Sequence, residues 1–228
     1  MHDALNASGH LLFFSMCEWG VKDPATWAKP IGNSWRTTGD IVATWTSWTK
    51  ILDGNDKWWT YAGPGGWNDP DMLEVDNGDM SEEEQRAHFT LWCLIKAPLI
   101  LGMDLRSISD HALELITNKE LIGWNQDRLG VQGHKVSQRE LLETNGEKNV
   151  VEVWASPLDK GHYAIVLFNR GTTPQNITAD WTDIEIPTAS AMKARDVWQR
   201  KDIGTFARNF TSLVEPHSVV AVELIPEF

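Results

Sequence analysis

A continuous apolar run near the amino terminus constrains the fold of this chain most strongly. Residues Leu11 to Met16 read Leu-Leu-Phe-Phe-Ser-Met, without alternation between apolar and polar side chains. An uninterrupted apolar run of this length is typical of a strand in a parallel sheet that is buried on both faces. The run ends at the polar and aromatic tip Cys17-Glu18-Trp19-Gly20. The sequence therefore predicts a buried strand over residues 11–16.

Helical and strand-like segments alternate after this run. Asp23-Pro24 has the pattern of a helix start, and Ser81 to Glu84 forms a capping box in front of an apolar helical face. Two further buried strands are predicted at residues 97–101 and 121–125, and Ser109 is expected to cap a helix between them. Alternating strands and helices are typical of a parallel α/β unit.

The pattern changes after about Gly133, where short strands follow one another at the spacing of an antiparallel β-sandwich. These strands are predicted at Val150–Trp154, Tyr163–Phe168, Asn176–Thr178, Ala194–Trp198, Thr205–Phe210 and Val219–Leu224. We therefore expect two domains, 1–133 and 134–228. The first is too short for a closed (β/α)₈ barrel, which needs about 250 residues. It is either a small open α/β sheet or half a barrel.

Composition excludes several classes of function. The net charge of −12 argues against broad nucleic-acid binding, which requires clustered Lys and Arg. The most apolar stretch, Ala97 to Met103, is far shorter than a membrane span of ~20 residues. Two cysteines cannot build a disulfide framework, and the helical spacing around Cys93 predicts a buried thiol. No phosphate-binding glycine motif, Ser-His-Asp order or metal-ligand spacing is present that would indicate another kind of site.

Carboxylates and tryptophans coincide where loops leave the predicted strands. The carboxylates are Glu18, Asp40, Asp69 and Asp71, and the neighbouring rings are Trp19, Trp35 and Trp67. Arg36 stands four residues before Asp40 and could orient the same ligand. Carboxylates with stacked indoles are typical of a sugar site, because acids act on the glycosidic oxygen and rings cover the apolar sugar face. The alternative is that these carboxylates only cap helices.

Several longer segments together resemble the melibiase-type α-galactosidases, the family-27 glycoside hydrolases, and the plant and fungal members most closely. The resemblance rests on Phe14–Gly20, Ser34–Ile41, Gly63–Leu73, Lys96–Leu99, Asp104–Arg106, Asn125–Gly130, Val166–Arg170 and Val197–Phe206. These segments follow the family's order and cover essentially the whole chain. The resemblance implies a (β/α)₈ barrel followed by an antiparallel β domain, and retaining hydrolysis of terminal α-linked galactose without metal or cofactor.

The resemblance also implies roles for individual residues. Asp40 matches the general acid/base, and Arg36 matches a substrate-binding arginine. Cys17, Glu18 and Trp19 match the pocket wall, and Asp71 and Met72 match its far rim. The family's nucleophile lies in a Lys-Tyr-Asp-Asn-Cys-like stretch on strand four that this sequence does not contain. We therefore expect the C-terminal half of the barrel, units five to eight, with strands one to four and the cysteine that would pair with Cys17 absent.

Two further expectations concern location and alternatives. Asn6, Asn176 and Asn209 begin N-glycosylation sequons, which with the family resemblance predicts a secreted protein. The expected partners are an α-galactoside oligosaccharide or polysaccharide and the missing half-barrel, with no nucleic acid and no membrane. An α-N-acetylgalactosaminidase is a rival, but the bulky Glu18 and Trp19 favour galactose. A further rival is an inactive fragment that only binds sugar.

Overall fold

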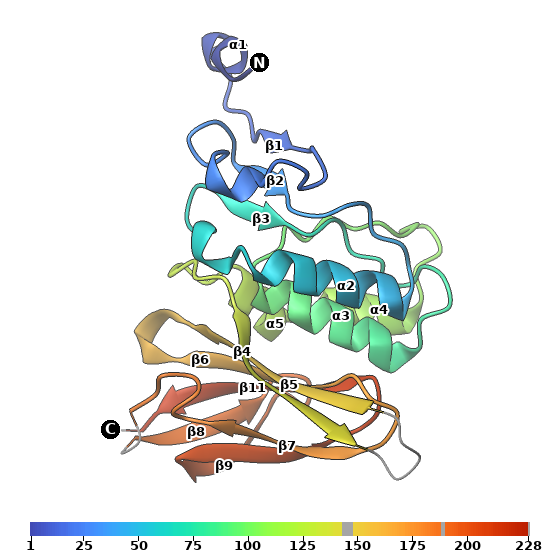
Figure 1. Cartoon of the computed structure of the whole chain (residues 1–228), viewed down its shortest axis with the longest axis vertical. Helices are drawn as coiled ribbons and strands as arrows, with labels where there is room; N and C mark the ends of the chain where they lie inside the picture. Colours follow the sequence, from blue (N-terminus) through green and yellow to red (C-terminus); the bar gives the residue numbers. More distant parts are fainter. Residues whose placement is uncertain (143–147, 188–189, 228) are drawn as a thin grey trace.

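The computed structural model describes residues 1–142, 148–187 and 190–227. The chain is layered along its long axis (Figure 1): α1 (His2–Ala7) and a small parallel sheet lie at one end, helices lie in the middle, and antiparallel sheets lie at the other end. The fold is therefore the C-terminal half of a (β/α)₈ barrel followed by an antiparallel β-sandwich, as the sequence predicts.

The half-barrel contains three parallel strands in the order β1 (Ser15–Met16), β2 (Ser34–Arg36) and β3 (Trp67–Asp69). A single parallel bridge between Leu73 and Leu101 adds one further backbone pairing. Five helices and two 3₁₀ turns accompany the sheet: α1, η1 (Pro24–Thr26), α2 (Trp45–Asp56), η2 (Trp59–Tyr61), α3 (Glu82–Leu94), α4 (Asp110–Ile116) and α5 (Lys119–Asn125).

Side-chain caps fix where the larger helices begin. Thr44 accepts a hydrogen bond from the Ser47 amide at the start of α2, and Ser109 caps α4. The capping box at Ser81 and Glu84 is confirmed, with both reciprocal hydrogen bonds formed. The helix predicted from Asp23-Pro24 is only the 3₁₀ turn η1, because Asp23 adopts a left-handed φ of 49° and its side chain makes no cap hydrogen bond.

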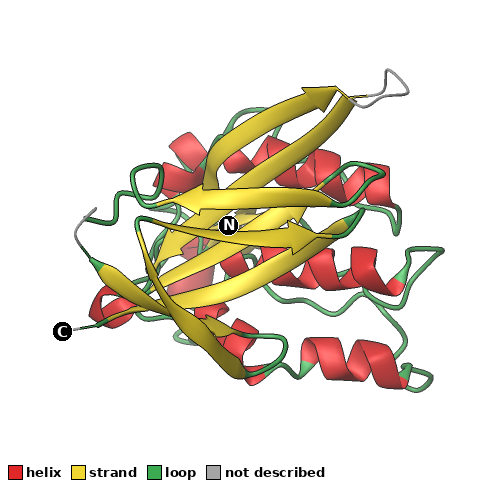
Figure 2. Cartoon of the chain, turned by 90° about the horizontal axis from the view of Figure 1, so that it is seen from below, coloured by secondary structure: helices red, strands yellow, loops and turns green. Residues whose placement is uncertain are grey.

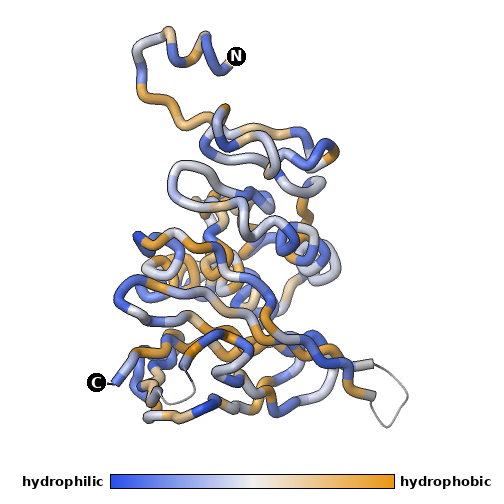
Figure 3. Tube along the Cα trace, turned by 60° about the vertical axis from the view of Figure 1, so that its left-hand side comes forward, coloured by the Kyte–Doolittle hydropathy of each residue, from blue (hydrophilic) through white to orange (hydrophobic). Residues whose placement is uncertain are grey.

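The buried strand predicted over residues 11–16 is wrong for most of its length. Only Ser15 and Met16 pair with β2, whereas Leu11 is fully exposed and Phe13 is 65% exposed. Figure 3 shows this apolar stretch leading from α1 into the sheet, away from the body of the molecule. The physical reason is that no described strand pairs with the outer edge of β1, so nothing covers these side chains.

Two other strand predictions in this half are also wrong. Residues 97–101 form no strand beyond the bridge at Leu101, since Pro98 has no amide hydrogen to donate to a ladder. Residues 121–125 lie in α5, where Asn118 caps the amides of Glu120 and Leu121. The buried side chains Leu121 and Trp124 are three residues apart, which is a helical spacing that the apolar run concealed.

The second half consists of a six-stranded sheet and a two-stranded sheet. The six-stranded sheet has the order β4 (His134–Leu142), β5 (Lys148–Pro157), β6 (Tyr163–Asn169), β11 (Ser218–Pro226), β8 (Ala191–Asp196) and β9 (Lys201–Ala207). The two-stranded sheet pairs β10 (Asn209–Val214) with β7 (Gln175–Asp180), and η3 (Asp159–Gly161) connects β5 to β6. All described strand pairs in these two sheets are antiparallel.

Most predicted strands of this half are present, with three differences. The segment 205–210 divides into β9 and β10 at Arg208, whose φ is 74°. The strand predicted at 194–198 begins and ends earlier, as β8. The sequence analysis missed β4, whose polar side chains give no apolar signal because it is an edge strand.

Two hydrophobic clusters hold these layers together. The first joins helix residues such as Trp48 and Trp92 to the side of the six-stranded sheet that includes Trp154 and Phe168. The second lies between that sheet and the β7–β10 pair. Figure 2 shows the strands lying across the helices. The first cluster contains residues from both sides of residue 133. The division of the chain into two domains at this residue therefore stays a prediction. No helix in the described part of the chain is long and apolar enough to cross a membrane.

Candidate functional site

The candidate site lies where β2 and β3 end. These parallel strands pair Arg36 with Asp69, so the loops that follow the two strands leave the sheet at the same edge. The carboxyl ends of parallel strands are where barrel enzymes build their active sites. Arg36 is the last residue of β2, Asp40 follows in its loop, and Asp71 lies two residues beyond β3. The structure thus brings together three of the residues that the sequence analysis selected.

Arg36 holds the two carboxylates. Its Nη2 atom lies 2.7 Å from Asp71 Oδ2 and 3.1 Å from Asp40 Oδ1, and it also donates to the Gly39 carbonyl at 2.9 Å. The Arg36 side chain is only 11% exposed. Its Nε atom is buried and finds no acceptor among the described residues. The guanidinium therefore lies between two acidic side chains, and its Nε–H is a buried donor without a partner among the described residues.

Asp40 is the exposed member of this cluster. Its side chain is 71% exposed, and Oδ1 accepts a hydrogen bond from Trp19 Nε1 at 2.9 Å as well as the one from Arg36. Oδ2 accepts no hydrogen bond within the part of the chain that the structure describes. One oxygen of Asp40 is thus fixed by an indole and a guanidinium, while the other is open to a ligand.

Asp71 is the buried member and is held by backbone amides. Its φ is 84°, and its oxygens accept hydrogen bonds from the Ile41 and Met72 amides, both at 2.9 Å. The Trp92 Nε1 atom donates to the Asp71 carbonyl at 2.9 Å, which ties this turn to α3. Sequence reasoning missed this role of Trp92, because its apolar helical neighbours indicate only a core residue.

Asp69 supports Asp71 from within the sheet. Its Oδ1 accepts the Asp71 amide hydrogen bond at 2.9 Å, and its own side chain is buried. Burial raises the pKa of the Asp69 carboxyl, although the Asp71 amide and the Arg36 guanidinium act in the opposite direction. Asp69 therefore belongs to the framework of the site rather than to its exposed surface.

The loop that follows β1 brings Trp19 to Asp40. Gly20 has a φ of 72°, and a Cβ atom there would lie 2.1 Å from the Thr37 carbonyl oxygen, so only glycine allows this approach. Trp19 itself is 55% exposed. The Glu18 carboxylate instead accepts hydrogen bonds from the Lys22 amide in the same loop.

The remaining predicted residues lie at the margin of the cluster. Cys17 is an exposed free thiol and Met72 is 38% exposed. Among the described residues, no side-chain hydrogen bond joins Cys17 or Glu18 to Arg36, Asp40 or Asp71, and Met72 reaches the cluster only through its backbone amide, which donates to Asp71 Oδ1. The other cysteine, Cys93, is fully buried, and burial raises the pKa of its thiol. Cys93 is therefore a core residue, as its helical spacing predicts.

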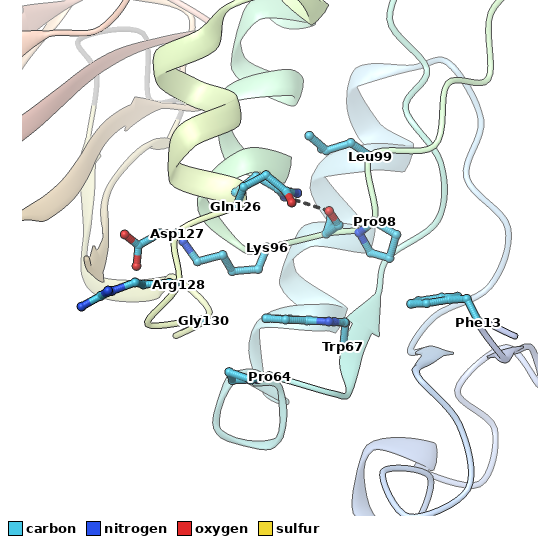
Figure 4. Close-up of a pocket in the computed structure, with 12 residues that line it drawn as sticks. Phe13, Pro64, Trp67, Lys96, Pro98, Leu99, Gln126, Asp127, Arg128 and Gly130 are labelled. Carbon is cyan, nitrogen blue, oxygen red and sulfur yellow. Dashed lines mark hydrogen bonds between the residues drawn. The ribbon is translucent and has the colours of Figure 1, made fainter. Parts of the chain in front are cut away.

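A separate cavity of about 440 Å³ lies near the amino end of β3 (Figure 4). Phe13, Trp67 and Pro98 form apolar parts of its wall, and Lys96, Asp127 and Arg128 supply charges. Burial lowers the pKa of the Lys96 ammonium to about 8, and this group donates to the Trp124 carbonyl. Because Trp67 begins β3 whereas Asp69 ends it, this cavity is distinct from the Arg36 cluster.

In the described ranges, no group of three or more His, Cys, Asp or Glu side chains could hold a metal ion. The arrangement instead offers an exposed carboxylate, a buried guanidinium and an indole at one strand edge. These groups can bind hydroxyl groups and transfer a proton to or from an oxygen atom.

The half-barrel, with a carboxylate and arginine cluster at its strand ends, and the β-sandwich joined to it place the chain in the class of proteins that combine a (β/α) barrel with a β-sandwich. A sequence model of the family described as alpha galactosidase A matches residues 1–127, and that of the alpha galactosidase C-terminal beta sandwich domain matches residues 148–224. The chain belongs to the alpha galactosidase A family.

Similar proteins agree with this assignment. Alpha-galactosidase 2 of Arabidopsis thaliana is 50% identical over 218 residues, which are 96% of this chain and 53% of that protein. An alpha-galactosidase of Cyamopsis tetragonoloba is 49% identical, with coverage of 99% and 53%. The structure of alpha-galactosidase I from Mortierella vinacea has a TM-score of 0.89 at 30% identity, with coverage of 99% and 61%. The chain spans about half the length of the curated relatives it matches.

Proposed function

We propose that this chain supplies the acid/base side of the active site of a retaining α-galactosidase. The observation that carries the proposal is the Arg36 cluster, in which one carboxylate is buried and the other is exposed with a free oxygen. The proposed substrate is a terminal, non-reducing α-D-galactose unit of a galacto-oligosaccharide or galactomannan. Asp40 is the proposed general acid/base, and Arg36, Asp71, Met72, Cys17, Glu18 and Trp19 are the proposed substrate-binding residues.

The chemistry follows from the two oxygens of Asp40. With Oδ1 held by Trp19 and Arg36, Oδ2 carries the proton and gives it to the glycosidic oxygen as the bond to the anomeric carbon breaks. In the second step the Asp40 carboxylate removes a proton from the attacking water. Arg36 keeps Asp40 in position through the hydrogen bond that its Nη2 atom donates to Asp40 Oδ1.

A retaining reaction also needs a carboxylate nucleophile, about 5–5.5 Å from the acid/base carboxyl group. Asp71 is a poor candidate, because its two oxygens are occupied by Arg36 and by the Ile41 and Met72 amides. We therefore assign the nucleophile to the remainder of the barrel that relatives possess. That half-barrel is the proposed protein partner, and it would cover the exposed apolar side chains of Leu11, Leu12 and Phe13.

Galactose is favoured over N-acetylgalactosamine as the sugar. The loop at Glu18 and Trp19 carries bulky side chains where an acetamido group would need room, and Trp19 is fixed by its hydrogen bond to Asp40. Raffinose is present in the structure of a Saccharomyces cerevisiae alfa-galactosidase that has a TM-score of 0.92 and 23% identity to this chain, a similarity that concerns the fold. We also propose export from the cell, supported by the three sequons.

The test uses a completed enzyme, made by fusing this chain behind the portion of the Arabidopsis relative that it does not cover. The Asp40→Asn variant should lose turnover of raffinose by about 10²–10⁴-fold, because the leaving oxygen is no longer protonated. An aryl galactoside with an acidic phenol should lose much less in the first step, since its leaving group needs little protonation.

The matched control is Asp202→Asn, the same chemical change on β9 at the opposite end of the molecule (Figure 1). This variant should retain the turnover of both substrates. Equal losses on raffinose and on the aryl galactoside in the first step of the Asp40→Asn reaction would show that Asp40 only binds or orients the sugar, and the proposed acid/base role would be wrong.

A further inference from the structure

The two-stranded β7–β10 sheet has one face turned outward. Its antiparallel register pairs Asn176 with Leu213, Thr178 with Thr211, and Asp180 with Asn209. Paired residues in an antiparallel ladder share a face, so these six side chains lie together. The intervening residues, such as Ile177 and Phe210, are buried against the six-stranded sheet.

Two of the three sequons lie on this one face. The first is Asn176-Ile177-Thr178 on β7 and the second is Asn209-Phe210-Thr211 on β10. The two-residue repeat of a strand places the asparagine and the threonine of each sequon outward and its middle residue inward. Thr178 Oγ1 and Thr211 Oγ1 are hydrogen-bonded to each other at 2.8 Å. The hydroxyl groups of the two sequons thus meet at the centre of the face.

Both asparagines are free to carry a large group. Each side chain is exposed, and neither amide is hydrogen-bonded within the described part of the chain. Asn209 lies four residues along β10 from Leu213, the partner of Asn176, so the two asparagines are about 14 Å apart at a rise of ~3.4 Å per residue. Two oligosaccharides therefore have separate attachment points at the two ends of the face.

The same face has features that a glycan would protect. Both outer edges of the β7–β10 pair lack a strand partner among the described residues, and free edges invite pairing with other chains. Leu213, the register partner of Asn176 on this face, is 54% exposed. A polar, bulky oligosaccharide on each strand would hinder another chain from reaching these edges.

We infer that Asn176 and Asn209 are both N-glycosylated, and that the two glycans cover the outer face of the β7–β10 sheet. The donor is an oligosaccharide linked to a polyprenyl diphosphate. The bond between sugar C1 and the phosphate oxygen breaks, Asn Nδ2 forms the new bond to C1 and loses one proton, and the polyprenyl diphosphate leaves.

The folded sheet also indicates when this modification happens. In the folded sheet the two threonine hydroxyls bond each other, and the middle residues Ile177 and Phe210 are buried. A glycosyl-transferring enzyme that must hold the whole sequon could reach neither the bonded threonine hydroxyls nor the buried middle residues. Modification therefore precedes folding of β7 and β10, whereas the product fits the folded sheet without displacing any described contact.

The test expresses the full chain behind a fused signal peptide in a eukaryotic secretory host, so that entry into the pathway does not depend on the proposed export or activity. Microsomal and secreted material is deglycosylated enzymatically in heavy-oxygen water, and the conversion of each asparagine to labelled aspartate is measured by mass spectrometry. Both Asn176 and Asn209 should be labelled. An unlabelled Asn176 or Asn209 would overturn the inference.

Matched variants separate the sequon from the fold. Thr178→Ser keeps the hydroxyl and should keep the glycan at Asn176, whereas Thr178→Val should lose that glycan and retain the one at Asn209. The double variant Asn176→Gln/Asn209→Gln should scatter more light on gentle heating than Asn6→Gln, whose sequon lies on α1 at the other end of the molecule (Figure 1). Equal scattering by the two proteins would show that the glycans do not protect this face.

Discussion

Arg36 is the residue on which the geometry of the candidate site depends. It separates two carboxylates that would otherwise repel each other, and it is largely shielded from water. Its Nη2 atom makes the contacts with Asp40, Asp71 and the Gly39 carbonyl, so one nitrogen fixes the positions of all three groups.

A second residue with unusual electrostatics lies outside this site. Asp56 ends α2 and accepts a hydrogen bond from the Lys135 amide of β4 at 3.1 Å. Burial raises the pKa of the Asp56 carboxyl to about 6, despite the attraction of Lys135. The folded protein therefore binds this proton more tightly than the unfolded chain. As the pH rises from about 4 to 6, stability falls, and above pH 6 it stays at the lower level.

The Asp56→Asn variant should remove this penalty. The amide oxygen can still accept the Lys135 hydrogen bond, whereas no charge is buried. We expect the free energy of unfolding to increase by about 1 kcal/mol at pH 7.5, after allowance for partial solvent exposure, and to be unchanged near pH 3.5. Urea unfolding of the chain at both pH values measures this difference.

Asp53 provides the control on the same helix. It forms ion pairs with Arg170 and Lys135, at 2.7 Å and 3.4 Å, so Asp53→Asn should lower stability at pH 7.5. If Asp56→Asn instead lowers stability at pH 7.5 as Asp53→Asn does, the charged Asp56 is stabilising and the raised pKa is wrong.

At the residue scale, the sequence is most informative where a polar or charged side chain directly follows a predicted strand. Arg36, Asp40 and Asp71 were selected because polar side chains follow predicted strands, and the structure places them in one cluster. The contributions of Trp92 and Gly20 were not predictable. They depend on a contact between α3 and the β3 loop, and on the approach of one loop to the Thr37 carbonyl.

At the scale of elements, α2 is joined to the sandwich by a buried ion network. Glu152 on β5 is 2% exposed and pairs with Lys135 and Arg170, each at 3.0 Å. Arg170 also reaches Asp53 on α2 with two hydrogen bonds, at 2.9 Å and 2.7 Å. A buried carboxylate needs such partners, because an unpaired charge in this environment is strongly destabilising.

The Arg170→Gln variant should therefore be destabilised through Glu152. We expect a loss of roughly 2 kcal/mol, below the ~3–5 kcal/mol typical of a fully orphaned buried charge, because Lys135 remains as a partner. Adding Glu152→Gln should recover part of this loss, since the buried charge is then removed. Chemical denaturation of Arg170→Gln, Glu152→Gln and the double variant measures the coupling. A loss of stability in the double variant equal to the sum of the losses in the two single variants would contradict the network.

Backbone protection should differ along the chain. The strands β1, β2 and β3 contain two or three residues each, and no described strand pairs with the outer edge of β1. By contrast, α3 packs against β6 and β11 in the largest hydrophobic cluster. We expect amides at 11–36 to exchange hydrogen within short labelling times, and those of α3, β6 and β11 to be slow. Equal protection of both groups in a monomeric sample would show that the half-barrel is stable alone.

The same contrast explains which elements the sequence predicted well. Strands of the sandwich find their partners within the chain, so local pattern and packing agree at β5, β6 and β11. The run at 11–16 has the pattern of a buried strand, but no described strand pairs with its outer edge. At 121–125 the apolar run fits a strand or a helix equally well, and the Asn118 cap and the burial of Trp124 decide in favour of α5.

For the whole molecule, the half-barrel and the β-sandwich share one hydrophobic core. The first cluster runs from the helices into the six-stranded sheet, so the barrel helices are supported from the sandwich side. On the opposite side, Leu11, Leu12 and Phe13 remain exposed. The candidate site lies on the half-barrel. Of the two carboxylates that contact Arg36 there, Asp40 has a free oxygen, whereas both oxygens of Asp71 are occupied.

The central claim is that this chain contributes the acid/base of an α-galactosidase and requires the rest of the barrel for turnover. Phenol release from an aryl α-galactoside tests it most directly, measured for the chain alone, for the chain fused behind the missing portion of the Arabidopsis relative, and for the fused Asp40→Asn variant. The account predicts turnover by the fusion, much slower steady-state turnover by its Asp40→Asn variant, and none above buffer by the chain alone. Clear turnover by the 228-residue chain, abolished by Asp40→Asn, would contradict it.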